Sequence, residues 1–291
     1  MFQKLKRAIK GATETEESAA RTVPYLTISP EEALCLGQEG STLQTVSQRL
    51  ADALSRPPFF TVLKGMPPAA DRRAIENIAH AIAEMPPLKA AVTPGKRQKT
   101  SFTRVQINPA KNMQNGGSTN YSRTNLPLDL HTDSSYKVDP QDLVIFQMVR
   151  SATDGGDSLM VLVDDLVDQL TDADIATLQK PIFPLGKVGL PVLWKEQGAW
   201  HMRYYRTQID TMVAQGYPFP SEGRKAVEAL DDALQDTPWY YQFALEGGET
   251  LFLNNRRVLH GRTGFGPDSD RLMYRYRLYA GCLNAGDRST L

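Results

Sequence analysis

A β-barrel or β-sandwich with helices packed on its outside is the fold class that the sequence predicts. Helical patterns dominate the first third of the chain, whereas short runs rich in β-branched and aromatic residues dominate the region after residue 128. A chain of 291 residues can bury a large core, and barrels of this length often form one domain. We therefore expect a single domain over 1–291, with helices and a first strand in 1–94 and the β-rich core in 95–291.

The first third contains two helical segments with a strand between them. SPEEALCLGQEGSTLQTVSQRLADAL is expected to form a helix that begins after Ser29, because serine is a favoured N-cap and Pro30 suits the first helical position. PFFTVLKGM is rich in β-forming residues and predicts a strand. PAADRRAIENIAHAIAEM predicts an amphipathic helix, since its alanines and isoleucines recur on one face.

The segment 95–128 differs in character, because it is polar and rich in Gly, Asn and Ser. It is too long for an ordinary connection, so we expect it to be either disordered or functional. Beyond it, DLVIFQMVR and GGDSLMVLV predict strands, and DDLVDQLTDADIATLQK predicts helical structure. The remainder predicts short strands separated by turns, namely PVLWK, WHMRYY, ETLFLNN, RVLHGRT and RLMYRYRLYA.

Composition excludes several classes of partner. The chain has 33 basic and 33 acidic residues, so no overall charge attracts it to nucleic acid or to an anionic membrane. Cys35 and Cys282 are too few for a disulfide scaffold and form no CxxC motif. The N-terminus lacks the apolar core of a signal peptide, and no apolar run is long enough to span a membrane. We expect a cytoplasmic protein whose partner is a small molecule; its oligomeric state is not indicated.

Two histidines and an aspartate are the first candidates for chemistry. His131 and Asp133 lie two positions apart at the end of a strand-like run, and side chains with this spacing share one face. An imidazole and a carboxylate placed in this way can bind one divalent metal, although an isolated HxD pair is more often a hydrogen-bonded surface pair. His260 ends the apolar part of RRVLHG and is suited to point into a cavity, although alone it would be interpreted as a core histidine.

A row of arginines follows the second histidine. Arg271 and Arg275 share one face of the predicted strand RLMYRYRLY, and Arg277 continues that face. Buried arginines are costly unless they are paired, so the row indicates an anionic ligand, unless it is a solvated strand face with cross-strand partners. Two histidines and one carboxylate are also the facial triad of non-haem iron(II) oxygenases. An arginine beyond the distal histidine can then bind the far carboxylate of 2-oxoglutarate by a bidentate hydrogen bond.

On these residues the chain resembles the taurine dioxygenase superfamily of Fe(II)/2-oxoglutarate-dependent oxygenases, including its γ-butyrobetaine hydroxylase-like members. The resemblance extends from about Thr119 to Tyr279, and four motifs occur in family order: NLPLDLHTDSSY, GGDSLMV, NNRRVLHGRTGF and RLMYR. It implies a mainly β fold with flanking helices, the double-stranded β-helix or jelly roll, in a single catalytic domain. It also implies that a lid at about 107–122 covers the metal.

The resemblance assigns roles to six residues. It implies that His131, Asp133 and His260 bind Fe(II) and form the catalytic centre, and that Ser158, Arg271 and Arg275 bind the cosubstrate 2-oxoglutarate. Dioxygen is then the oxidant, and succinate and CO2 are released. The expected reaction is oxidation, most simply hydroxylation, of an unactivated C–H bond. Outer partners commonly orient metal-binding imidazoles, and Asn254 or Asn255 could do so, although asparagines in a tight turn are the simpler interpretation.

The substrate is expected to be small, polar and carboxylate-bearing, for example an amino acid, because several arginines are expected near the mouth of the site. The candidate substrate contacts are Asn120, Tyr121, Tyr136, Arg203, Arg206 and Arg262. Alternatively, an aromatic cage could bind a quaternary ammonium group, and its candidate members are Tyr136, Trp194, Tyr204 and Tyr205. His201 is expected to face solvent and to have no role.

Three other functions stay open. Desaturation or ring closure would use the same iron site with a different placement of the substrate. A zinc hydrolase can also use two histidines and one carboxylate, although no HExxH motif supports it. A jelly-roll binding module without catalysis is the third alternative, and the intact triad with its arginine argues against it.

Overall fold

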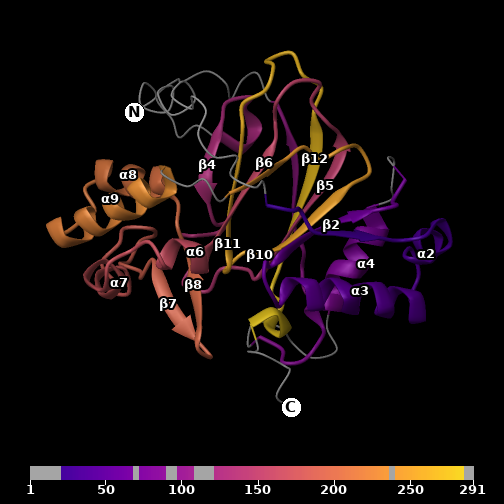
Figure 1. Cartoon of the computed structure of the whole chain (residues 1–291), viewed down its shortest axis with the longest axis horizontal. Coiled ribbons are helices and arrows are strands. Elements are labelled where there is room, and N and C mark those ends of the chain that lie inside the picture. The colour runs from indigo at the N-terminus through magenta and orange to yellow at the C-terminus, as the bar shows by residue number, and fades with distance from the viewer. Residues whose placement is uncertain (1–20, 68–71, 90–96, 108–120, 236–239, 285–291) are drawn as a thin grey trace.

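Two β-sheets face each other across an apolar core, and helices cover the outer face of each sheet (Figure 1). The computed structural model describes residues 21–67, 72–89, 97–107, 121–235 and 240–284. In this part of the chain the larger sheet contains, in spatial order, β1 (Tyr25–Thr27), β2 (Phe60–Lys64), β10 (Thr250–Asn254), β5 (Leu143–Arg150), β12 (Leu272–Leu278) and β3 (Ser101–Gln106). The smaller sheet contains β4 (Leu128–His131), β11 (Val258–Arg262), β6 (Ser158–Leu162) and β9 (Tyr241–Phe243). A separate hairpin consists of β7 (Leu193–Glu196) and β8 (Ala199–Met202).

The central strands β2, β10 and β5 of the larger sheet are buried on both faces. Along β5, Val144 and Phe146 point into the core between the sheets, whereas Ile145 packs against the helices outside. Side chains alternate along a strand, so a strand covered on both sides needs an almost continuous apolar run, which LVIFQMV provides. Each fully buried side chain of this kind contributes roughly 1.5–3 kcal/mol to stability. The predicted sandwich with outer helices is therefore confirmed.

Helices from the first third pack on the larger sheet: α2 (Pro30–Cys35), α3 (Ser41–Leu54) and α4 (Arg72–Ala83). Ser29 caps α2 as predicted, because its hydroxyl accepts a hydrogen bond from the backbone N–H of Glu32. The single helix expected after Ser29 is nevertheless two helices. Two glycines, at 37 and 40, lie in the break between them, where they lower the helical propensity of the chain.

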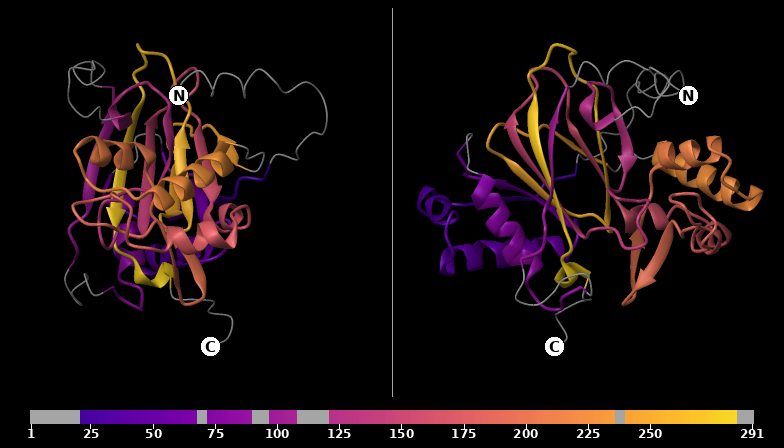
Figure 2. Two further views of the ribbon diagram at one scale, coloured as in Figure 1. Left: turned by 90° about the vertical axis from the view of Figure 1, so that its left-hand side faces the viewer. Right: turned by 180° about the vertical axis from the view of Figure 1, so that it is seen from behind.

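A second group of helices covers the smaller sheet, on the side of the molecule opposite to the first group (Figure 2). These helices are α6 (Val163–Val167), α7 (Asp172–Leu178), α8 (Arg206–Ala214) and α9 (Ser221–Gln235). The helices α8 and α9 were not predicted, because only strands and turns were expected there. In α9 the buried residues Ala226, Val227 and Leu230 have helical spacing, and this signal was available in the sequence.

The segment 95–128 is also partly regular. β3 pairs along β12 in antiparallel register, so that Thr103 lies opposite Arg275 and Val105 opposite Met273. A short 3-10 helix, η1 (Tyr121–Arg123), precedes β4, and another, η2 (Gly281–Asn284), follows β12. Most of the predicted lid at 107–122, including Asn120, lies outside the described residues. Among the helices that are described, none combines the length and the apolar character needed to cross a membrane.

Candidate active site

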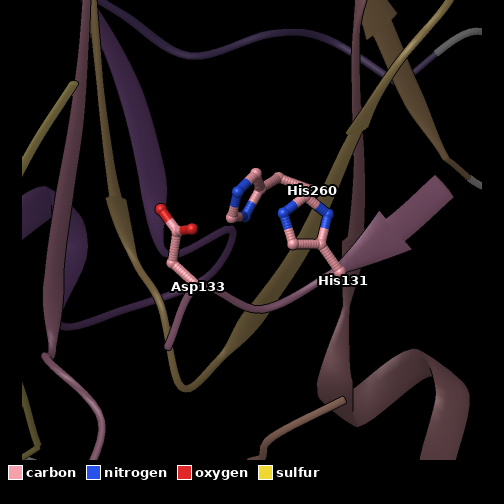
Figure 3. A group of neighbouring side chains, drawn as sticks. All are labelled: His131, Asp133 and His260. Carbon is pink, nitrogen blue, oxygen red and sulfur yellow. The ribbon is translucent and has the colours of Figure 1, made fainter. Parts of the chain in front are cut away.

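His131, Asp133 and His260 converge between the two sheets. His131 ends β4 and His260 lies in the middle of the adjacent β11, where the two residues are direct partners in the sheet. Asp133 follows two positions later, in the turn after β4. One potential ligand atom from each side chain lies within 4.8 Å of the other two. Figure 3 shows the carboxylate and the two imidazole rings pointing toward one another.

The three side chains are buried, and several of their polar atoms are free to bind a metal. Within the described residues, both ring nitrogens of His260 and the Oδ2 atom of Asp133 have no hydrogen-bond partner. The Nδ1 atom of His131 lies 2.8 Å from the carbonyl oxygen of Asp129, which can only accept, so Nδ1 carries the proton. The other ring nitrogen, Nε2, therefore has its lone pair available.

The charge states also suit a cation. Burial lowers the pKa of His131, and burial together with the neighbouring His131 lowers the pKa of His260 to about 3. Burial alone would raise the pKa of Asp133, but the charges of Arg275, His260 and Arg277 hold it at about 2. Arg275 Nη1 donates to Asp133 Oδ1 at 2.9 Å. At neutral pH the centre thus has two neutral imidazoles and one carboxylate, which is a donor set for a divalent metal.

A cavity extends from the histidines to a pair of buried arginines. Its lining includes Phe146, Met160, Ser158, Arg262 and Arg271, in addition to both histidines and Arg275. Ser158 and Arg262 are partners in the pairing of β6 with β11, so both lie at the far end of these strands. Arg271 immediately precedes β12 and enters the cavity from the larger sheet.

The far end of the cavity is cationic. Within the described residues, no carboxylate lies within 4.0 Å of the charged nitrogens of Arg262 or Arg271. Burial lowers the pKa of Arg271 to about 10, and burial together with the charge of Arg271 lowers that of Arg262 to about 9. Both guanidinium groups therefore stay charged at neutral pH, and both lie over the ring of Phe265, at 4.6 Å for Arg262 and 5.4 Å for Arg271. Two buried cations without an anion favour an anionic ligand.

Glycines in the GGDS turn allow it to pack closely against Gly264 and the side chain of Arg271. Gly155 and Gly156 have φ values of 66° and 78°, which non-glycine residues rarely adopt. A Cβ atom at Gly155 would lie 2.2 Å from the carbonyl oxygen of Gly264. A Cβ atom at Gly156 would lie 3.4 Å from Arg271 Nε. The motif is therefore needed for close backbone packing as well as for its hydroxyl group.

The predicted substrate contacts do not all reach this cavity. Arg262 lines it, but its Nη2 atom donates to the carbonyl oxygens of Thr124 and Leu126, at 2.9 and 2.6 Å. Tyr136 is 53% exposed in the turn after Asp133. Tyr121 lies in η1, and its side chain, like Asn120, lies outside the described residues.

Arg203 and Arg206 do not line the cavity, and each has partners of its own. Arg203 is buried beneath Trp194, with its guanidinium 4.7 Å from the ring centroid, and donates to the carbonyl oxygen of Lys137 at 2.6 Å. Arg206 forms ion pairs with Asp210 and Asp231. Both arginines therefore stabilise the packing around the smaller sheet, and neither reaches the cavity.

Of the aromatic-cage candidates, Trp194 and Tyr204 have partners elsewhere, whereas the ring of Tyr205 lies 5.0 Å from that of His131. The expectation that His201 faces solvent was wrong. The Trp194 ring is occupied by Arg203 and stacks on His201, with 5.7 Å between ring centroids. Tyr204 is buried and donates its hydroxyl to Asp231. His201 does not face solvent, since it is fully buried next to Trp194. Side chains alternate between the two faces of a strand, but the alternation alone does not show which face is buried. The sequence did not indicate what β7 and β8 pack against, so the buried face could not be assigned.

Two cavity residues were not predicted, and Arg277 was noted in the arginine row without a role at the metal. Val105 on β3 and Ser122 in η1 line the cavity, although they belong to a segment that was expected to be irregular. Arg277 lies 3.9 Å from Asp133 Oδ1 and donates to Ser134, so it reaches the metal end as well. Its spacing from Arg271 and Arg275 along one strand face was the available signal.

The fold and the three ligand-type side chains are those of the non-haem iron(II) oxygenases with a two-histidine, one-carboxylate triad. The sequence matches the model of the taurine catabolism dioxygenase TauD, TfdA family over residues 32–181 and 188–277. The chain belongs to this family, whose enzymes depend on iron(II) and 2-oxoglutarate, and the predicted superfamily is confirmed. The match does not single out the γ-butyrobetaine hydroxylase-like members.

Solved structures share the fold at low sequence identity. An asparagine oxygenase in complex with Fe(II), 2S,3S-3-hydroxyasparagine and succinate is 17% identical, with a TM-score of 0.64, and the match covers 88% of this chain and 93% of that chain. The non-heme iron oxygenase OrfP in complex with Fe and alpha-ketoglutaric acid is 16% identical, with a TM-score of 0.61, and the match covers 88% of this chain and 94% of that chain. These similarities confirm the predicted double-stranded β-helix.

Proposed function

We propose that this protein is an Fe(II)/2-oxoglutarate-dependent dioxygenase that hydroxylates an unactivated C–H bond of a small, carboxylate-bearing substrate such as an amino acid. One observation carries the proposal. Both histidines of the buried triad His131, Asp133 and His260 line a cavity together with Arg271, a buried cation for which the described residues provide no counter-charge. We also propose a single catalytic domain, because β1 and β2 from the first third of the chain belong to the same sheet as β10 and β12.

The residues present fit an iron(II) ion. The unpartnered nitrogens of His260, the unpartnered Oδ2 of Asp133 and the free Nε2 lone pair of His131 form a buried set of nitrogen and oxygen donors. Three protein ligands leave further coordination positions for a chelating cosubstrate and dioxygen. With 2-oxoglutarate and dioxygen, iron(II) held here would supply the oxidant that replaces a C–H hydrogen by a hydroxyl group, with succinate and CO2 as the other products.

Arg271 and Ser158 would bind the far carboxylate of 2-oxoglutarate, since both line the end of the cavity remote from the triad. Arg262 would add to the positive potential there without direct contact, because its Nη2 atom is engaged by two carbonyl oxygens. Arg275 would keep Asp133 ionised by its hydrogen bond to Oδ1 and, as a lining residue of the cavity, would contribute to binding the keto-acid end of 2-oxoglutarate. The apolar walls formed by Phe146 and Met160 would exclude water from the reacting groups.

The substrate class is inferred from charge. Arg275 and Arg277 both lie within 4.0 Å of Asp133 Oδ1, so positive charge exceeds negative charge at the metal end. A substrate carboxylate would be attracted to these guanidinium groups, whereas a cationic substrate group would be repelled. Structures of similar fold contain hydroxylated amino acids, (3S)-hydroxy-L-Arg in OrfP and 3-hydroxyasparagine in the asparagine oxygenase, which supports an amino-acid-like substrate here.

The proposal is tested by titrating the metal-free protein with Fe(II) and 2-oxoglutarate in the absence of oxygen. We expect one equivalent of each to bind and a weak visible charge-transfer band to appear only when both are present. Amino acids are then screened for substrate-dependent release of succinate in air. Binding of Zn(II) without any binding of 2-oxoglutarate would instead favour the hydrolase alternative.

A further inference from the structure

The metal-ligand candidate Asp133 lies in a turn and not on a strand, so regular strand pairing does not hold its backbone. β4 ends at His131, and the next residues form a sharp turn. Ser134, directly after Asp133, has a φ of 60°, which is an uncommon conformation for a residue with a side chain. Such conformations persist when the surrounding structure determines them. Something outside the turn must therefore keep the carboxylate in place.

The side chain of Asn255 forms that support. Its Oδ1 atom accepts a hydrogen bond from the backbone N–H of Asp133 at 2.8 Å, and its Nδ2 atom donates to the carbonyl oxygen of Asp133 at 2.9 Å. Nδ2 also donates to the carbonyl oxygen of Gln141 at 2.9 Å, and the backbone N–H of Asn255 donates to the carbonyl oxygen of Asp142 at 2.7 Å. The primary amide thus pairs with both backbone groups of Asp133, as a neighbouring strand would.

Asn255 also connects two metal-ligand candidates through one short turn. It lies between β10 and β11, and β11 carries His260 five residues later. A rigid turn at this position would set the distance between Asp133 and His260 before any metal binds. On the opposite side, the backbone of Thr132 donates to the carbonyl oxygen of Tyr204 at 2.8 Å, and the hydroxyl of Thr132 accepts from the backbone of Tyr204 at 3.0 Å.

We propose that Asn255 is a positioning residue for the metal centre: it holds the backbone of Asp133 so that the carboxylate is already in its metal-binding position in the metal-free protein. This differs from the sequence-based expectation that an asparagine here would orient the imidazoles. The inference rests on the proposed function, because it assumes that Asp133 is a metal ligand. It requires hydrogen-bond donation from Asn255, which aspartate at this position cannot provide.

The chain offers a matched control in the neighbouring residue. Asn254 is equally buried, but its Nδ2 atom donates to the carbonyl oxygens of Leu54 and Leu283 and to Asn284 Oδ1. These bonds attach the turn to η2 and to the end of α3, and none of them reaches Asp133. A purely structural role for Asn255 would therefore be reproduced by substitution of Asn254.

The experiment measures binding of Co(II), whose visible absorption reports coordination geometry, to the metal-free wild type and to the variants Asn255→Ala, Asn255→Asp and Asn254→Ala. Outer hydrogen-bond partners of metal ligands typically change metal affinity by about 10–100-fold, so both Asn255 variants should raise the Kd for Co(II) by at least about tenfold and alter the absorption spectrum. Asn254→Ala should lower the melting temperature but leave the Kd within about threefold of wild type. Equal Kd values for all variants that fold would overturn the inference.

A second measurement needs no substitution. In the metal-free wild type, the backbone N–H of Asp133 should exchange slowly with solvent deuterium, and Zn(II), used as a diamagnetic probe, should add little protection. Fast exchange that becomes slow only after Zn(II) is added would show that the metal, and not Asn255, orders the turn. If the wild type binds neither Co(II) nor Fe(II), the proposed function fails. If it binds them but Asp133 is unprotected, only this inference fails.

Discussion

The two ends of the cavity differ in how the protein satisfies their polar groups. At the metal end, Asp133 accepts a hydrogen bond from Arg275, its backbone is paired with Asn255, and the ring of His131 is fixed by the carbonyl oxygen of Asp129. At the far end, Arg262 and Arg271 are buried with no carboxylate within ion-pair distance among the described residues. The first end is held by the protein itself, and the second lacks a counter-charge.

This difference teaches what each end must do. Metal ligands act only in a narrow geometry, so their support has to come from the folded chain before the metal arrives. An anion-binding site gains affinity when the charge that completes it comes from the ligand, because a cation already neutralised by the protein would attract that ligand less. At the far end, burial of two cations without a counter-charge therefore costs free energy, which binding of a dicarboxylate can offset.

The largest expected effect is at the metal end. Asp133→Ala removes a ligand and leaves Arg275 without its partner, so the Kd for Fe(II) should rise by more than about a hundredfold, the upper figure for loss of an outer partner alone. Substrate-dependent release of succinate should be lost as well. Metal titration and a succinate assay check both effects, with Asp232→Ala, an exposed carboxylate on α9, as the control. A variant that still binds Fe(II) and turns over at the wild-type rate would contradict the assignment of Asp133.

The next effect is at the far end. Charged hydrogen bonds contribute about 1.5–3 kcal/mol, so Arg271→Ala should raise the concentration of 2-oxoglutarate required for half-maximal rate by about ten- to a hundredfold. The Kd for Fe(II) alone should stay within about threefold of wild type, because Arg271 and the triad lie at opposite ends of the cavity.

The control for Arg271 is Arg150→Ala. Arg150 is exposed and pairs with Asp270, which directly precedes Arg271, so its loss removes a nearby positive charge without changing the cavity lining. If both variants raise the 2-oxoglutarate requirement equally, general electrostatics would explain the effect, and the direct role of Arg271 would have to be abandoned.

The smallest expected effect is on the stability of the folded protein at acidic pH, through the buried His201. Burial, followed by the charges of Arg257, Arg256 and Lys89, lowers the pKa of His201 to about 3. A histidine whose pKa is lowered on folding contributes stability that is present above its unfolded pKa of about 6.5 and is lost as the pH falls toward 3. His201→Phe, which keeps the stacking on Trp194, should therefore retain on the order of 1–3 kcal/mol more of its neutral-pH stability than wild type at pH 4.

Thermal unfolding of both proteins between pH 7 and pH 4 measures this difference. Met202, the residue after His201, donates its backbone N–H to the carbonyl oxygen of Arg256, so protonation of His201 should weaken the turn that holds Asn255. Co(II) affinity should then fall with acid more steeply in wild type than in the variant. If the Co(II) affinity of both proteins depended on pH in the same way, protonation of His201 would have no effect on the metal centre.

Much of the site was predictable because its chemistry depends on residue types at short or characteristic spacings. His131 and Asp133 are two positions apart, and Arg271 follows His260 by eleven positions. The jelly roll was predictable from short apolar runs and from the order of the motifs. Errors occurred where the local pattern was ambiguous. α8 and α9 were missed, β3 was assigned to an irregular segment, and His201 was placed on the wrong face of its strand.

By itself, the sequence determined the chemical groups available, the approximate fold class and the family, because these depend on composition, periodicity and ordered motifs. Only the tertiary structure decided which groups support one another. Asn255 and Asp133 are 122 positions apart, and their hydrogen bonds form because the turn after β4 meets the turn between β10 and β11. Arg203 and Arg271 are both arginines beside β-strands, yet one is buried beneath Trp194 and the other lines the cavity. Contacts between distant segments depend on packing in three dimensions, so the spacing of residues within a short stretch of sequence does not predict them.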